Sequence, residues 1–252
     1  MIEIKNLKKQ FGETIACDID SLTINDGEVL GLVGNNGAGK TTLFRMMLDL
    51  LKPDDGQVLI DGINPAESEA WKDTTAAYID EGFLIDFLTP EEYFAFLGKL
   101  GGMKPDEVAQ RTALYEQLAG GEIFGQKKLI RNLSAGNKQK VGIISALIRQ
   151  PRLLILDEPF NFLDPTSQNV LKHVIGDYSS RTGATVVVSS HNLQHTVDIS
   201  TRIALLEKGH IVSDLPNKDG SARSKLDRYF EVGMLSDDST RADKSDENEK
   251  KI

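Results

Sequence analysis

The chain has 252 residues, of which 40% are hydrophobic, and its 29 basic and 38 acidic residues give a formal net charge of −9. This predicts a globular protein of one large or two small domains, and the acidic balance argues against a nucleic-acid partner. No apolar run approaches the roughly 20 residues needed to cross a bilayer, the N-terminus lacks signal-peptide features, and a single cysteine permits no intrachain disulfide, so we expect a cytoplasmic protein.

The N-terminal part of the sequence predicts β-strands. IEIKNL, IACDIDSLTI and EVLGLV carry strand patterns, and a turn at 25–27 separates the last two. Cys17 falls in the second run, where a small core side chain is expected. After a glycine-rich loop, residues 41–51 are apolar on nearly every side and predict a buried helix, and QVLIDG returns as a strand.

Residues 82–150 predict an inserted helical block. Thr89-Pro90-Glu91-Glu92 has the pattern of a capping box, with proline at the first helical position. Two further helices are expected at 105–119 and 134–149.

The rest of the sequence alternates between strands and a helix. LLILD (153–157) is typical of a strand buried on both faces, a helix is expected at 165–178, and ATVVVSS, RIALLE and HIVSD predict further strands. Strands alternating with helices therefore predict an α/β domain with a largely parallel sheet and the inserted helices. Residues 233–252 are densely charged and predict a disordered tail.

The stretch GNNGAGKTT (34–42) fits the pattern G-x-x-x-x-G-K-[ST] between a strand and a helix. Glycines let the backbone curl so that its N–H groups point at phosphate oxygens. A chance glycine turn would lack the flanking strand and helix, and Thr42 stands where a dinucleotide fingerprint needs glycine. The loop therefore predicts a nucleoside triphosphate site, contacted by Asn35, Asn36, Gly37, Ala38, Gly39, Lys40, Thr41 and Thr42.

A phosphate loop needs an acidic partner for the metal ion, and Asp157-Glu158 follows the buried strand at 153–157. Asp157 and the hydroxyl of Thr41 are the expected Mg²⁺ ligands, and Glu158 is expected to activate the attacking water. Paired acids after a strand can also be a solvated loop, but the phosphate loop makes that interpretation the weaker one.

Several motifs in the same order resemble the nucleotide-binding subunits of ATP-binding cassette (ABC) transporters over residues 1–232. NLSAGNKQK (132–140) is similar to the family's signature LSGGQ, FLDP (162–165) to the loop after it, and VVVSSH ends in the switch histidine, His191. Phe11 stands where the family places an aromatic ring on adenine.

The resemblance implies an ABC ATPase fold over residues 1–232, a P-loop NTPase core with an antiparallel β subdomain and an inserted helical subdomain. It also implies ATP hydrolysis shared between two subunits, either a homodimer or a heterodimer with a second ATPase. Ser134 and Gly136 would hold the γ-phosphate of ATP bound to the opposite subunit, because Ser134 caps a helix with free N–H groups. Asp164 would lie at the dimer seam and His191 would contact the γ-phosphate. The chain would drive a separate transmembrane permease and reach the inner face of the membrane only through it.

Some positions depart from the family pattern. Glu81 stands where glutamine is usual, and we expect it to contact Mg²⁺ or the attacking water and to alter metal dependence or slow the basal rate. Ala135 and Asn137 replace signature residues, and we expect function to survive both changes. Phe160 replaces a threonine and is expected to pack. The run SAGNKQK is closer to drug and lantibiotic exporters, which favours export.

Alternatives remain open at this point. His195 lies four residues after His191, as in some zinc sites, but no third ligand is near. Aromatic residues at the start of the helical block fit its core for the most part, or else a groove for a permease: Phe83, Phe87, Tyr93, Phe94 and Phe96.

Two other functions compete with transport. A soluble ABC ATPase, such as that of iron–sulfur cluster assembly, differs in having a soluble scaffold as its partner. An ordinary P-loop kinase or GTPase would leave the signature, FLDP and His191 as coincidences, and a strong GTP preference would identify it.

Overall fold

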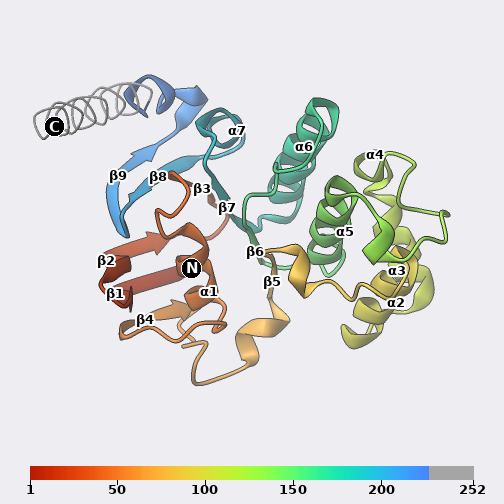
Figure 1. Ribbon diagram of the computed structural model, residues 1–252, viewed down its shortest axis with the longest axis horizontal. Coiled ribbons are helices and arrows are strands. Elements are labelled where there is room, and N and C mark those ends of the chain that lie inside the picture. Colours follow the sequence, from red (N-terminus) through yellow and green to blue (C-terminus); the bar gives the residue numbers. More distant parts are fainter. Residues whose placement is uncertain (227–252) are drawn as a thin grey trace, which may run out of the picture.

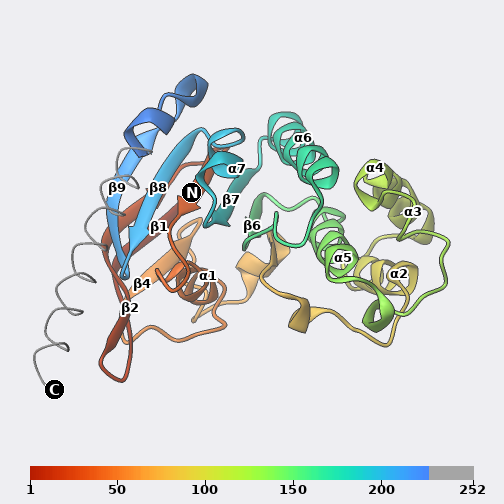
Figure 2. The same cartoon turned by 45° about the horizontal axis from the view of Figure 1, so that its top comes forward.

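The computed structural model describes residues 1–226, which form two β-sheets and a block of helices to one side of them (Figures 1 and 2). The tail expected at 233–252 lies outside the described residues. No helix of the described part is long and apolar enough to span a membrane. The strands are β1 (Ile2–Phe11), β2 (Thr14–Ile24), β3 (Val29–Val33), β4 (Asp55–Ile60), β5 (Thr75–Tyr78), β6 (Leu153–Leu156), β7 (Thr185–Ser190), β8 (Arg202–Glu207) and β9 (His210–Pro216). The α-helices are α1 (Lys40–Met47), α2 (Pro90–Leu100), α3 (Pro105–Ala113), α4 (Glu116–Ala119), α5 (Ala135–Leu147), α6 (Pro165–Thr182) and α7 (Leu193–Val197). The short 3₁₀ segments are η1 (Ala70–Asp73), η2 (Glu81–Phe83), η3 (Ile130–Asn132) and η4 (Lys218–Gly220).

The smaller sheet is antiparallel, with strand order β2-β1-β4. Alternate residues of its strands are buried, as the period of two predicts. Cys17 is among them, at 1% exposure, which confirms that it is a core side chain. The strands predicted at the N-terminal end of the sequence are therefore confirmed: β1, β2 and β4 form the antiparallel β subdomain, and the run EVLGLV becomes β3 of the larger sheet.

The larger sheet has the order β5-β6-β7-β3-β8-β9, parallel except for the β8–β9 pair. In β6, Leu153 and Ile155 pack toward the antiparallel sheet and α1, whereas Leu154 and Leu156 pack toward the helical block. Both faces of this strand are thus buried, as its continuous apolar run predicts. The carboxyl ends of β3, β6 and β7 are neighbours, so the loops after these three strands meet at one edge of the sheet.

The helices follow the predicted pattern with three corrections to their bounds. The capping box is present, since Thr89 accepts from the Glu92 amide and Glu92 caps Thr89 in return. Helix α1 ends at Met47, four residues earlier than expected, and Asp49 beyond it has a left-handed backbone (φ 53°). The helix expected at 105–119 is broken between α3 and α4, and α6 continues to Thr182, where Gly183 ends it.

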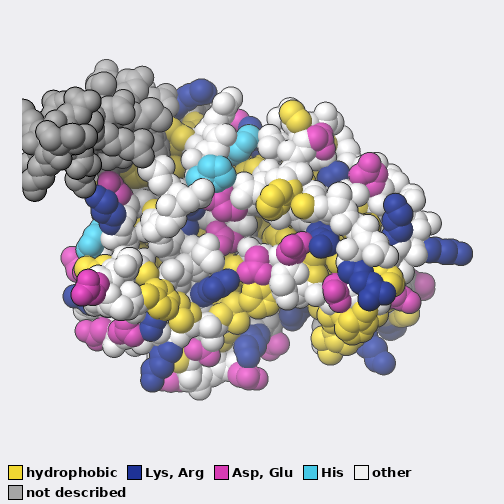
Figure 3. All heavy atoms as spheres, in the orientation of Figure 1, with side chains coloured by type: hydrophobic (Ala, Val, Ile, Leu, Met, Phe, Trp, Pro, Cys, Tyr) yellow, Lys and Arg dark blue, Asp and Glu magenta, His cyan; other side chains and the backbone are white. Residues whose placement is uncertain are grey.

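The aromatic residues at the start of the helical block separate into two groups. Tyr93 and Phe94 are buried, whereas Phe83, Phe87 and Phe96 are 52%, 65% and 42% exposed. Hydrophobic side chains gather on the surface over α2 (Figure 3). The expectation that most of these rings form the core of the block is therefore wrong for three of them, because they project from η2, from the loop after it and from the outer face of α2.

Candidate functional site

The glycine loop follows β3 and opens α1, as the motif predicts. Gly39 has φ 110°, and a Cβ built on it would lie 2.1 Å from the carbonyl oxygen of Ala16 in β2. A Cβ on Gly34 would lie 2.3 Å from the carbonyl oxygen of Leu206 in β8. Only glycine fits at both positions, so the loop is pressed between the two sheets and its curl is fixed.

The side chain of Lys40 lies inside the turn of the glycine loop. This side chain is buried, and Nζ donates to the carbonyl oxygens of Gly34 at 2.6 Å and Asn35 at 3.2 Å. It also forms an ion pair with Glu158, with Nζ and Oε1 3.2 Å apart. The ammonium is therefore held inside the loop, where a phosphate group would be gripped.

Asp157 follows β6, and its side chain is hydrogen-bonded to residues at the end of β7 and at the start of α1. It is 5% exposed, its Oδ2 accepts from the hydroxyl of Thr41 at 2.5 Å, and its Oδ1 accepts from the hydroxyl of Ser189. Burial raises the pKa of Asp157 above its ordinary value, and the two hydroxyl donors oppose that shift. The hydroxyl oxygen of Thr41 and the carboxylate of Asp157 thus lie side by side. Oxygen atoms of these kinds are the ligands that Mg²⁺ prefers.

Glu158 lies at the centre of the polar cluster and has a left-handed backbone (φ 46°). Its amide donates to Ser189 Oγ at 2.8 Å, and its carbonyl accepts from Gln139 Nε2 at 3.0 Å. Its Oε2 lies 2.8 Å from His191 Nδ1. Within the described part of the chain, the buried Oε1 accepts no hydrogen bond and has only the ion pair with Lys40, so an acceptor remains for a water proton.

A pocket of about 310 Å³ opens beside these groups. Glu81 belongs to its lining, and its carboxylate forms an ion pair with Lys138 of α5 at 3.0 Å. The extra negative charge that Glu81 introduces is therefore balanced within the same chain. Residues that line the pocket are Thr41, Tyr78, Ile79, Asp80, Glu81, Ala135, Gln139, Asp157, Glu158, Asn161 and Phe162.

Ser134 is the N-cap of α5, as predicted, and accepts from the amide of Asn137 at 3.2 Å. A Cβ on Gly136 would lie 2.6 Å from the carbonyl oxygen of Phe162, so the glycine is required by the loop after β6. Asp164 accepts from the amides of Thr166 and Ser167 and caps α6, and its hydrogen bonds with Ser167 lower its pKa. Ser134, Gly136 and Asp164 do not line the pocket that contains Asp157 and Glu158.

The remaining predicted residues lie on the flanks of the site. Phe11 is 52% exposed at the end of β1, with Lys9 Nζ 5.6 Å from the centre of its ring. Phe160 is buried, which confirms that it packs, and its ring stacks on His195 with centroids 4.9 Å apart. No group of three or more metal-ligating side chains accompanies His195 within residues 1–226.

Three residues of the cluster were missed by the motif reasoning. Ser189 bridges Asp157 and Glu158, and Gln139 links the carbonyl of Glu158 to the hydroxyl of Tyr78, which donates to Gln139 Oε1 at 3.0 Å. The only sequence signal for them is position: Ser189 precedes His191 by two residues on a strand, and Gln139 lies one turn into the signature helix.

Known proteins are similar to this chain in sequence and in fold. The ABC transporter family model matches residues 17–161. The bacitracin transport ATP-binding protein BcrA of Enterococcus faecalis is 33% identical over 92% of this chain and 74% of its own length. A solved ATP-binding subunit of an ABC transporter is 26% identical with a TM-score of 0.80, covering 92% of this chain and 99% of its own.

A second solved structure shows the same fold. The dimeric, ADP- and Pi-bound cassette MJ0796 is 24% identical with a TM-score of 0.77, and the match covers 86% of this chain and 99% of that one. The mixed, largely parallel sheet, the antiparallel sheet and the helical block are thus those of an ABC ATPase. The chain accordingly belongs to the ABC transporter family, as an ATP-binding domain with ATPase activity.

Proposed function

We propose that this chain is the energy-coupling subunit of an ABC exporter, which hydrolyses Mg²⁺-ATP between two cassettes and drives a separate transmembrane permease. The observation that carries this proposal is the linked cluster of Lys40, Thr41, Asp157, Glu158 and His191 at the edge of the parallel sheet. The cluster brings together an ammonium group that can bind phosphate, two oxygens that can bind a metal ion, and a general base.

Each side chain has a role that its contacts support. Lys40 binds the β- and γ-phosphates, and Thr41 and Asp157 are the residues that would hold Mg²⁺. When bound, Mg²⁺ neutralises charge on the β- and γ-phosphate oxygens. Phe11 is an exposed ring available to adenine, and the amides of residues 35–42 surround the phosphates.

In the first step of hydrolysis, the ammonium of Lys40 exchanges its ion pair with Glu158 for one with the γ-phosphate. A bound γ-phosphate gives the ammonium a new anionic partner and weakens its ion pair with Glu158. Glu158 Oε1 then accepts a proton from the attacking water, while His191 Nδ1 keeps the other carboxylate oxygen in place. Glu81 lies in the same pocket, and it would contact the metal ion or the water at the expense of its ion pair with Lys138.

A second cassette completes each site. The first amides of α5 have no acceptor within their own helix, and Ser134 and Ala135 are exposed. This helix end is a second anion site, which we assign to the γ-phosphate held by the partner, with Gly136 beside it and Asp164 at the seam. The partner is another copy of this chain or a second ATPase subunit.

The permease is the remaining partner. Phe83, Phe87 and Phe96 are exposed and provide aromatic anchors for a cytoplasmic segment of a membrane protein. We assign the domain to residues 1–232, with its helical subdomain at about 82–150, and place it at the inner face of the membrane through the permease alone. The similarity to the bacitracin transport protein supports a role in transport, and the run SAGNKQK favours export as its direction.

The composite site is tested with Glu158→Gln, which retains ATP binding while losing the base. We expect its mass in solution to change from monomer to dimer when Mg²⁺-ATP is added. Adding Ser134→Phe should abolish the dimer without affecting ATP binding to the monomer. Ser68→Phe is the matched control, because Ser68 is also exposed and caps a turn, at 3.3 Å from the amide of Ala70.

The outcome depends on ATP binding, which equilibrium dialysis measures separately. A variant that binds ATP and stays monomeric at every protein concentration would contradict the self-assembled sandwich. A dimer that survives Ser134→Phe would contradict the assignment of the α5 end to the partner's phosphate.

A further inference from the structure

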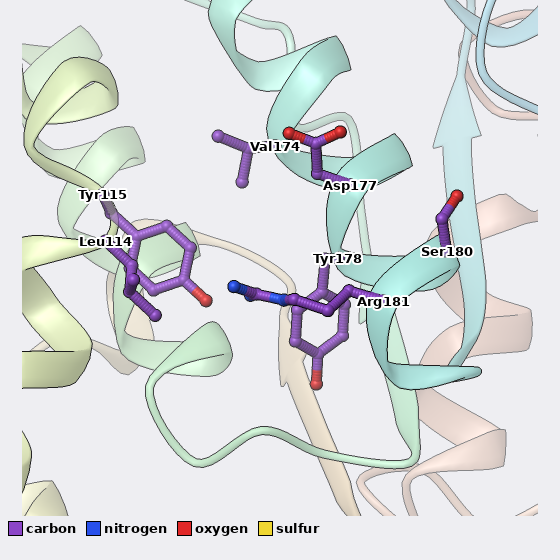
Figure 4. Close-up of a pocket in the computed structure, with 7 residues that line it drawn as sticks. All are labelled: Leu114, Tyr115, Val174, Asp177, Tyr178, Ser180 and Arg181. Carbon is purple, nitrogen blue, oxygen red and sulfur yellow. The ribbon is translucent and has the colours of Figure 1, made fainter.

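A second pocket, of about 470 Å³, lies between the helical block and α6, away from the nucleotide cluster. Its walls come from the junction of α3 and α4 on one side and from the second half of α6 on the other (Figure 4). The lining residues are Leu114, Tyr115, Val174, Asp177, Tyr178, Ser180 and Arg181. None of them has a role in the nucleotide site.

Tyr115 provides the first polar group of this pocket. The residue is 3% exposed, and its hydroxyl has no hydrogen-bond partner among residues 1–226. In Figure 4 the hydroxyl points into the space between the helices, toward the end of the Arg181 side chain. Buried hydroxyls are nearly always hydrogen-bonded, because an unpaired one loses its hydration without compensation. The pocket therefore holds a donor that lacks an acceptor.

Arg181 provides the second polar group. Among the described residues it makes no ion pair, although Asp177 lies four positions earlier on the same helix. Figure 4 shows the Asp177 carboxylate turned away from the guanidinium. The neighbouring Arg111, by contrast, is committed to Glu107 at 2.5 Å and to the carbonyl of Ile148 at 2.8 Å. The N–H groups of the Arg181 guanidinium and the neighbouring Tyr115 hydroxyl are hydrogen-bond donors, and the two oxygens of a carboxylate can accept from them.

The other residues of the pocket indicate what the rest of a carboxylate ligand would have to be. Leu114 and Val174 are apolar, and the hydroxyl of Tyr178 is already used, donating to the carbonyl of Pro151 at 2.6 Å. The negative charge of Asp177 disfavours a dianion in the same space. The volume lies within the range of small-molecule sites.

We propose that this pocket is a binding site for a small monocarboxylate with an apolar body. One carboxylate oxygen accepts from the Tyr115 hydroxyl and the guanidinium of Arg181 binds the group, while the apolar body lies against Leu114 and Val174. Such a ligand contacts the helical block and α6 at the same time. The site is independent of the proposed transport function.

Binding is measured by titration calorimetry on the full chain without nucleotide, using 4-phenylbutyrate, octanoate and indole-3-acetate as probes. The neutral 4-phenylbutanol is the matched ligand for the first of these. We expect at least one acid to bind with a Kd below about 1 mM, and its alcohol to bind roughly tenfold or more weakly. Tyr115→Phe and Arg181→Gln should each weaken the acid by roughly tenfold or more, because each removes a bond to a charged group.

Two controls keep the test specific. Arg131→Gln removes an exposed arginine of the helical block outside the pocket and should leave the Kd unchanged. Tyr115→Phe should retain the melting temperature of the ligand-free protein, because the hydroxyl it removes has no partner, yet lose the rise in melting temperature that the acid produces.

Several results would overturn the proposal. They are the absence of saturable binding by all three acids, equal binding of the acid and its alcohol, and an unchanged Kd in Arg181→Gln. A lower melting temperature of ligand-free Tyr115→Phe would show that the hydroxyl is structural, which also overturns it.

Discussion

Ser189 is the residue whose removal tests the construction of the site most directly. It is fully buried on β7, its hydroxyl donates to Asp157 Oδ1, and it accepts from the amide of Glu158 at 2.8 Å. Ser189→Ala leaves the backbone and the packing volume nearly unchanged. It removes both hydrogen bonds and leaves a buried carboxylate oxygen and a buried amide each without that partner.

The expected size follows from these two contacts. A hydrogen bond to a charged group contributes about 1.5–3 kcal/mol, and a buried amide left unpaired costs about 1–3 kcal/mol. Because the two losses overlap in one small region, we expect the free energy of unfolding to fall by about 2–4 kcal/mol. If Asp157 holds Mg²⁺ as proposed, it also loses support for that role, and loss of such support costs roughly 10- to 100-fold in metal affinity or activity.

The effect depends on pH in a defined direction. The pKa of Asp157 is raised by burial, so the folded protein retains this proton at a pH where the unfolded chain has lost it. Stability from this group is therefore present in acid and is lost as the pH rises through the raised pKa. Ser189 stabilises the charged form, so its removal raises the pKa of Asp157 further, and the deficit in Ser189→Ala should be larger at neutral pH than in mild acid.

Urea unfolding at several pH values gives the stability, and ATPase rate against Mg²⁺ concentration gives the metal dependence. Ser145→Ala is the matched control, since Ser145 is also a buried serine and donates to the carbonyl of Gly142 at 2.7 Å in α5. The Ser145→Ala variant should lose about 1 kcal/mol of unfolding free energy, and its ATPase rate should depend on Mg²⁺ concentration as in the wild type. If Ser189→Ala has the stability, pH dependence and Mg²⁺ dependence of the wild type, the contacts described for Asp157 do not hold the site together.

The remaining predictions concern the pocket edge and the packing of α5. Glu81→Gln should shift the Mg²⁺ dependence of ATP hydrolysis while the free energy of unfolding changes by less than about 1 kcal/mol, because its ion pair with Lys138 is solvent-exposed. Superimposable Mg²⁺ titrations would contradict a role for Glu81 near the metal ion. Gly142→Ala should destabilise the protein by about 1–3 kcal/mol in urea unfolding, since the new Cβ would lie 2.0 Å from the ring of Tyr78. Gly176→Ala is its control, with no atom near the added methyl group, and should stabilise α6 by about 0.5–1 kcal/mol. Equal stabilities of the two variants would contradict the close contact between α5 and β5.

Much of the fold and of the proposed catalytic cluster could be predicted from the sequence. The phosphate loop, Asp157-Glu158 and His191 each follow a strand, and parallel strands bring their carboxyl ends to one edge of a sheet. The bounds of helices were less certain, because their ends depend on single residues such as Asp49 and on packing at the α3–α4 junction.

The sequence by itself determined the elements and the family, because strand alternation, capping boxes and glycine loops depend on residues within a few positions of one another. Only the tertiary structure decided which distant side chains meet. The ion pair of Glu81 with Lys138, the bridging role of Ser189 and the unpaired hydroxyl of Tyr115 opposite Arg181 all join separate elements. Such contacts depend on strand order and on how helices pack on the sheet, which local periodicity does not encode.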